Sequence, residues 1–421
     1  MELFERVATL ITRRRHLVPL MSVAMFLLSV QQLAVQVLRS GLNGLSGALQ
    51  GWMYYTVAVL SANYVDAGLV RRGLGGAIAR LFSPTPYVAG LAFHVFSALV
   101  LIAALITFHQ RYAPRLPRAS VLLFAIFIVG SPQTFLGWGN DLARTDMLVT
   151  GAVVWAALAL LSHRPFVAAA VLLVASQVHE TAILFGGPLL VVLALSVPAV
   201  ARAEHRNQLL AGAALGLALV AIALLQNSIG PSLPEVTAIM RARTPPPASQ
   251  WYADLRDCAI YMLVAGFRGV RTAICYNEYY AAHLPMAVAS LGIVAVNAVI
   301  LGIERKAVAV LIAVVAPLVF MNYVASDMGR WLKFTAVNLW VLAVLYHATG
   351  VVSLSRPRIV LGTVLLALLL AMGPSRVHQP NPGIARIAGW LGYPAAPEVA
   401  EWMTRCDPDW RAIAAGELTV R

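Results

Sequence analysis

Residues 63–76 read NYVDAGLVRRGLGG and form a charged, glycine-rich loop between two apolar stretches, residues 42–62 and 87–108. The loop carries one carboxylate, on Asp66, two adjacent arginines and four glycines. Charged groups at a membrane boundary are costly unless they are paired or hydrated. We therefore expect this loop to have a function and the rest of the chain to be arranged around it.

Two later stretches repeat this combination, GNDLARTD at 139–146 and SDMGRW at 326–331. Each of the three stretches places an Asp three to five residues before an Arg, at the end of an apolar run. We predict that all three lie on one side of a membrane and converge.

The composition excludes a soluble domain. Sixty per cent of the residues are hydrophobic, 12% are charged and the mean hydropathy is +0.77, whereas about a quarter of the residues in a soluble domain are charged. Apolar runs of about 17–25 residues, the length of a membrane-spanning helix, recur along the chain. The expected fold class is all-α, a polytopic transmembrane helix bundle, because a β-barrel would show alternation in segments of about ten residues.

About eleven runs are predicted to be spans, and residues 42–62 and 257–270 to be interfacial or re-entrant helices, the former in the first extracytoplasmic loop. Residues 1–373 form the predicted bundle, which carries the site on its extracytoplasmic face. The predicted spans are residues 17–38, 87–108, 119–137, 147–163, 165–179, 181–200, 208–226, 284–303, 307–325, 333–350 and 358–373.

The last residues, 374–421, are predicted to form a short extracytoplasmic tail. Trp390, Trp402 and Trp410 have amphipathic spacing in this tail, which favours packing on the membrane face.

Loops rich in Lys and Arg fall on one side of the predicted bundle, which makes that side, with the N-terminus, cytoplasmic. This cytoplasmic excess of Lys and Arg accounts for part of the net charge of +13. We therefore do not attribute the charge to a nucleic-acid partner and expect none. The basic residues are Arg13, Arg14, Arg15, Arg111, Arg115, Arg118, Arg164, Arg202, Arg206, Arg305, Lys306, Arg356 and Arg358.

Several arginines in the loops on the opposite side run against the bias and indicate an anionic ligand there. The alternative is that Asp–Arg pairs hold the loops together. These arginines are Arg71, Arg72, Arg80, Arg144, Arg241, Arg243, Arg256, Arg268, Arg271 and Arg330.

Asp66 is the first candidate catalytic residue. A carboxylate can deprotonate an acceptor hydroxyl while Arg71 and Arg72 grip a phosphate bidentately. The competing interpretation is an Asp66–Arg72 salt bridge that fixes a turn.

Asp141 and Asp146 form a second candidate pair, as acid and base or as ligands of a divalent metal, the one cofactor that the sequence suggests. The structural alternative makes Asp141 a helix N-cap and places Asp146 in the first turn, where negative charge is favourable. Arg144 is unfavourable at a helix start unless it faces an anion or a carboxylate.

His179 and Glu180 interrupt the apolar stretch SQVHETAILFGGP at a tight turn. They are candidates for contact with a substrate hydroxyl or pyrophosphate, and the alternative is a buried His–Glu pair. Asp327, Arg330 and Trp331 complete the substrate-binding candidates. The Trp331 ring is either a stacking face for a sugar or an interfacial anchor.

Cys258 and Cys275 fall in one predicted external loop. In an oxidising compartment they could form a disulfide, and the alternative is two free thiols.

These features resemble the GT-C glycosyltransferases, which use polyprenyl-phosphate-linked sugars. Asp66 matches the acidic residue of their first extracytoplasmic loop, and Asp141 and Asp146 match the second loop. HETAILFGGP also looks like the His-containing turn of EpsG-type exopolysaccharide and O-antigen polymerase proteins. The chain departs from GT-C enzymes that have a soluble C-terminal domain, because only its short tail follows the last span.

The resemblance implies a multi-pass protein of the bacterial inner membrane that moves a sugar from a polyprenyl-phosphate donor to a glycan or lipid-linked acceptor on the periplasmic side. The alternatives are a polymerase or ligase of lipid-linked glycans and a transporter or flippase for an anionic lipid-linked glycan. ATPase, dehydrogenase and serine-hydrolase motifs are absent from the sequence.

Overall fold

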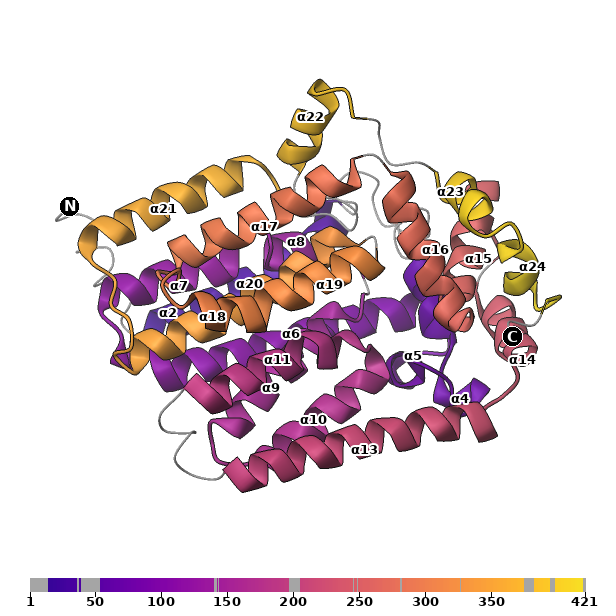
Figure 1. The fold of residues 1–421 in the computed structure, drawn as a ribbon, viewed down its shortest axis with the longest axis horizontal. Coiled ribbons are helices and arrows are strands. Elements are labelled where there is room, and N and C mark those ends of the chain that lie inside the picture. The colour runs from indigo at the N-terminus through magenta and orange to yellow at the C-terminus, as the bar shows by residue number, and fades with distance from the viewer. Residues whose placement is uncertain are drawn as a thin grey trace.

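The computed structural model describes residues 14–35, 38, 54–139, 142, 144–196, 205–244, 246–247, 249–280, 282–325, 327–374, 382–393 and 398–418. Every regular element in these ranges is a helix, which confirms the all-α class (Figure 1). Within the described residues, six helices are long and apolar enough to cross a membrane, as expected for a membrane protein. They are Pro86–Arg115, Arg118–Trp138, His205–Ile229, His283–Ile300, Ala307–Val324 and Met328–Ala348.

Helix α20, Met328–Ala348, is the centre of the bundle. Its residues are buried from Met328 to His347, polar ones included. Neighbouring helices surround it on all sides, since a helix that is apolar or buried around its whole circumference needs partners on every face. The neighbours are α6 (Pro86–Tyr112), α7 (Arg118–Gly130), α9 (Asp146–Leu160), α11 (Thr181–Ser196), α17 (His283–Ile300) and α19 (Ala316–Val324).

Peripheral helices cover this centre. Helix α10, Pro165–Val178, packs against α9, and α13, His205–Ile229, packs against α10. Most of the apolar side chains of α13 are exposed, as expected for a helix that faces lipid. The remaining helices of the bundle are α2 (Arg14–Ser29), α8 (Phe135–Trp138), α18 (Ala307–Val310), the π-helical turn η2 (Leu311–Val315) and α21 (Arg356–Ala371).

Each of the eleven predicted spans contains a helix, but five of these helices are short. Helices α9, α10 and α11 have 15, 14 and 16 residues. At 1.5 Å per residue they extend roughly 21–24 Å, less than the hydrocarbon core of about 30 Å. The number eleven therefore stays a prediction.

The glycines of the first loop have separate structural roles. Asn63 caps the short helix α4, Tyr64–Ala67, by accepting the backbone N–H groups of Val65 and Asp66. Gly68 then takes φ 63° and ψ −148°, a conformation open essentially to glycine alone. A Cβ on Gly76, in α5 (Gly73–Phe82), would lie 2.4 Å from a carbonyl oxygen of the preceding helical segment. Close backbone packing thus positions the charged loop.

Five helices form a second buried core, and we call them the outer helix group. They are α14 (Leu233–Arg243), α15 (Gln250–Val264), α16 (Gly266–Tyr279), α23 (Val399–Cys406) and α24 (Trp410–Ala415). Trp402 and Trp410 are buried in this core, so the prediction that they pack on the membrane face is wrong. Trp390 of α22, Pro382–Trp390, is 83% exposed.

The cysteine pairing differs from both sequence interpretations. Cys275 of α16 forms a disulfide with Cys406 of α23, 131 residues away, and Cys258 is a buried free thiol. Close by, Asp407 accepts hydrogen bonds from Arg268 Nε and Nη2, each 2.6 Å long, and from the Tyr261 hydroxyl, also 2.6 Å. The tail is therefore fastened to α15 and α16.

The disulfide can be tested by counting thiols. Denatured without a reductant, the protein should take up one equivalent of iodoacetamide, on Cys258, and after reduction three, as measured by intact mass. Cys406→Ser should release Cys275 and make a second thiol reactive without reduction. Three reactive thiols in the unreduced protein would contradict the pairing.

Acid should weaken the attachment of the tail. Burial raises the pKa of Asp407, but hydrogen bonds from Arg268 and Tyr261 outweigh it, so the pKa lies below its ordinary value. A depressed pKa contributes stability that is complete above about pH 4 and is lost as the pH falls through the folded-state pKa. Asp407→Asn should cost about 2 kcal/mol at pH 7, and this difference should shrink in more acidic buffer. Thermal unfolding at several pH values measures it.

Candidate functional site

A buried ion pair joins the second and third Asp/Arg stretches. Arg330 donates from Nε and Nη2 to the two carboxylate oxygens of Asp146, over 2.9 and 2.6 Å. Its Nη1 donates to Asp327 over 2.5 Å. Asp146 is fully buried at the start of α9, and Arg330 lies in the first turn of α20. The predicted convergence holds for these two stretches.

The first loop meets the His179–Glu180 turn. Arg71 donates from Nε to Glu180 Oε1 over 2.6 Å, and Arg72 donates from Nε to Oε2 over 2.7 Å. Burial raises the pKa of Glu180, but the guanidiniums of Arg72 and Arg71 outweigh it and hold the pKa well below its usual range. Glu180 thus stays ionised and keeps both arginines in place.

Arg72 has an unusual backbone. Its φ of 59° and ψ of 14° are left-handed, which is rare for a residue with a long side chain. Such conformations persist where the surroundings fix them, and they cluster at functional sites. Here the conformation accompanies the contact of Arg72 with Glu180 at the start of α5.

His179 lies between the two charged groups. Its Nδ1 lies 3.3 Å from the Thr181 backbone nitrogen and 3.4 Å from Glu180 Oε2. The charges of Arg72 and Glu180 act on this ring, and so do those of Arg330 and Asp146. The His179 ring is therefore within electrostatic range of both ion-pair groups.

Tyr55 is part of the same region and was missed by the sequence analysis. The Arg144 guanidinium lies 4.7 Å from its ring centroid. Burial raises the pKa of Tyr55, and charges on Arg144, Asp327 and Arg72 also act on the hydroxyl. Its one sequence signal is a tyrosine pair within an apolar stretch, which is commonplace at a membrane interface.

These residues define what we call the charged centre. In the described part of the chain, four arginines here face three carboxylates. Its members are Tyr55, Arg71, Arg72, Arg144, Asp146, His179, Glu180, Asp327 and Arg330.

Asp66 lies in a separate polar group. It accepts a hydrogen bond from Asn63 Nδ2 over 2.7 Å and pairs with Arg243 of α14, while Arg80 Nε is 3.9 Å away. The alternative of an Asp66–Arg72 salt bridge is therefore wrong. The partner Arg243 is 177 residues away in the sequence, at the end of α14, so no local spacing could indicate it.

The described ranges contain no cluster of side chains of the kind that the metal hypothesis requires. Within them, no three His, Cys, Asp or Glu side chains are grouped so as to hold a metal ion. Asp146 directs both of its oxygens to Arg330. Asp141, the other expected ligand, lies outside the described residues.

Trp331 is not placed to stack on a sugar. Its ring is buried and stacks at 6.2 Å on Phe185 and at 6.4 Å on Phe334, while Arg330 lies 5.1 Å from its centroid. The interpretation of Trp331 as an accessible ring failed because α20 enters the core directly after Asp327. Neighbouring helices therefore cover the whole of α20. Trp331 therefore supports Arg330 from the core side.

An apolar groove reaches the charged centre. It has a volume of about 540 Å³ between α5, α6, α9 and α10, and every lining residue is apolar. Two of these residues, Leu74 and Val178, adjoin the centre, since Leu74 follows Arg72 by two residues and Val178 precedes His179. The apolar groove is therefore lined by residues that are close neighbours in sequence of Arg72 and His179.

No protein-family model, curated protein or solved structure matches this chain. Its function is therefore inferred from its own residues.

Breaking the central ion pair should be costly. Asp146→Asn or Arg330→Met leaves an unpaired buried group and should lower the free energy of unfolding by about 3–5 kcal/mol. The double variant should recover part of the loss, because both charges disappear together. Thermal unfolding in detergent measures these changes.

The matched control is Arg358→Met. Arg358 pairs with Glu304 at a partly exposed position, so its loss should cost at most about 1 kcal/mol. Equal effects of Arg330→Met and Arg358→Met would contradict the importance of the buried pair.

Proposed function

We propose that this protein is an integral-membrane glycosyltransferase that moves a sugar from a polyprenyl-phosphate donor to a glycan or lipid-linked acceptor. The observation that carries the proposal is the apolar groove that adjoins an arginine-rich centre. A polyprenyl-phosphate sugar has a long apolar tail and an anionic head, and it needs both environments next to each other.

The phosphate is assigned to Arg71 and Arg72. The Arg71 side chain is 41% exposed and can turn from Glu180 to an incoming anion. A planar guanidinium binds phosphate oxygens bidentately. Glu180 would hold the two arginines in position before the donor arrives.

Asp66 is the proposed base of an inverting displacement. The acceptor hydroxyl oxygen bonds to the anomeric carbon while the bond from that carbon to the phosphate oxygen breaks. Polyprenyl phosphate leaves with the electron pair, and Asp66 takes the hydroxyl proton. The Asp66 side chain is 17% exposed and is oriented by Asn63 and Arg243, with carboxylate lone pairs left to accept a proton.

Asp146 receives a different proposed role. Its oxygens are committed to Arg330 in a fully buried position, so it positions Arg330 and through it the charged centre. For Asp141 the catalytic role stays a prediction.

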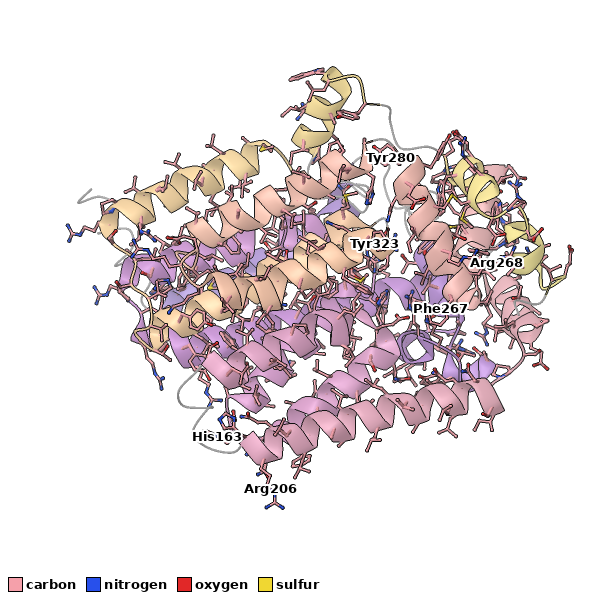
Figure 2. All side chains as sticks on the ribbon, viewed as in Figure 1. His163, Arg206, Phe267, Arg268, Tyr280 and Tyr323 are labelled. Carbon is pink, nitrogen blue, oxygen red and sulfur yellow. A yellow bond between two sulfur atoms is a disulfide. The ribbon has the colours of Figure 1, made fainter. Side chains whose placement is uncertain are left out.

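The site is proposed to face the periplasm, with the N-terminus in the cytoplasm. Arg206 at the start of α13 lies at the same end of the bundle as His163, far from Arg268 in Figure 2, as the positive-inside rule favours. The disulfide lies at the opposite end, and disulfides persist in oxidising compartments such as the periplasm.

An eleven-span, GT-C-like topology is part of the proposal. It adds five shorter helices to the six long ones. These are α2, α9, α10, α11 and α21.

Replacing the proposed base should abolish most turnover. Asp66→Asn should lower the rate by about 10²–10⁴-fold, since a general base contributes that much. The assay follows release of polyprenyl phosphate from radiolabelled undecaprenyl-phosphate monosaccharides, added to the protein in nanodiscs together with a membrane extract as acceptor source.

The matched control is Asp257→Asn. Asp257 is also half-buried and contacts two arginines, Arg241 and Arg256, but it lies in the outer helix group. It should keep wild-type turnover. Normal turnover by Asp66→Asn would exclude the assigned base. If the wild type moved the labelled lipid across a bilayer without releasing polyprenyl phosphate, it would be a transporter, and products lengthened in blocks would indicate a polymerase.

A further inference from the structure

A second groove begins on another side of Arg71. A cavity of about 230 Å³ is lined by Arg71 and by the end of α13, including Gln226. A larger cavity of about 970 Å³ follows it and opens along α16 to the segment Cys406–Pro408. The two share lining residues, so they form one passage, which we call the outer groove. The shared residues are Gln226, Asn227, Pro231, Leu233, Val264 and Gly266.

The outer groove differs from the apolar groove in chemistry. Amides of Gln226 and Asn227 and the hydroxyl of Ser232 line it, and these groups can donate and accept hydrogen bonds. Arg271 is exposed and forms no ion pair with any residue of the described ranges. Such groups bind the hydroxyls of a sugar chain, whereas the apolar groove has none of them.

An aromatic face completes the lining. Phe267 is 90% exposed and follows Gly266, whose φ of 52° turns the chain between α15 and α16. Figure 2 shows Phe267 and Arg268 close together at the α16 end of the molecule. An aromatic ring offers a flat apolar surface to the C–H face of a pyranose, beside polar groups that bind its hydroxyls.

We propose that the outer groove binds the hydrophilic glycan chain of the acceptor. This proposal rests on the proposed function. The acceptor's reactive end lies toward Arg71 and the rest of the chain runs along α16 past Arg271 and Phe267. Donor and acceptor thus reach the same centre by two routes, one lined by apolar side chains and one by polar side chains.

The outer wall of this groove belongs to the tail. Cys406 and Asp407 line it, and they are held to α16 by the disulfide with Cys275 and by the ion pair with Arg268. Without the disulfide this wall is held to α16 only by non-covalent contacts, namely the Arg268 ion pair and the packing of Trp402 on Tyr276. Acceptor binding therefore depends on the disulfide, whereas donor binding in the apolar groove does not.

The first test compares two double variants. Phe267→Ala/Arg271→Ala removes the proposed sugar contacts, and Arg386→Ala/Trp390→Ala removes an exposed cation and aromatic of α22 that do not line the groove. Initial rates are measured against the concentration of a glycan fraction prepared from membranes of cells that lack the protein, with a donor that the wild type accepts.

The groove variant should raise the KM for the glycan fraction about tenfold, as for one lost hydrogen bond from a charged donor, with kcat unchanged. Binding of undecaprenyl phosphate, followed by native mass spectrometry in nanodiscs, should not change. The α22 variant should match the wild type in both measurements.

The disulfide gives an independent test. Cys406→Ser should raise the KM for the glycan fraction and leave undecaprenyl phosphate binding unchanged, whereas Cys258→Ser, which removes the buried free thiol, should change neither.

Two outcomes would overturn the proposal. One is a wild-type KM in both Phe267→Ala/Arg271→Ala and Cys406→Ser. Another is weaker membrane insertion of the groove variant at unchanged KM, which would make Phe267 a membrane anchor. A wild-type protein that neither binds undecaprenyl phosphate nor transfers sugar would instead refute the proposed function itself.

Discussion

The buried Asp146–Arg330 ion pair is the constraint on which the charged end of this protein depends. Removing two charges from water is expensive, and the cost is offset here by two parallel hydrogen bonds and a third from Arg330 to Asp327. The partners are 184 residues apart and lie at the starts of α9 and α20. The pair thus fixes two central helices at the same level, and His179 and Tyr55 occupy the space beside it.

Two kinds of surface meet at this level. The apolar groove between α5 and α10 is lined by Leu74 and Val178, close in sequence to Arg72 and His179, and the outer groove is lined by Arg71. A lipid-linked substrate and a hydrophilic one could therefore approach the same guanidiniums without crossing. Glu180 lies where both substrates would arrive, because it pairs with both arginines and its side chain is 38% exposed.

The predicted pairings failed where the partners are far apart in the sequence. Asp66 pairs with Arg243 instead of Arg72, Arg72 pairs with Glu180, and Cys275 pairs with Cys406 instead of Cys258. The predicted extracytoplasmic side carries many arginines and many carboxylates, so spacing along the sequence cannot select among the possible pairs. The prediction of an accessible Trp331 ring failed for another reason. The burial of this ring depends on the neighbouring helices that cover α20.

The sequence by itself determined the helical class, the apolar helices and the gathering of Asp and Arg in a few loops, because hydropathy and charge are properties of local segments. It also determined local details such as the Asn63 cap, which needs partners two and three residues away. Only the tertiary structure decided which charges pair, which aromatic rings are buried and where the two grooves run. These depend on contacts between segments more than one hundred residues apart, such as Arg71 with Glu180 and Asp66 with Arg243.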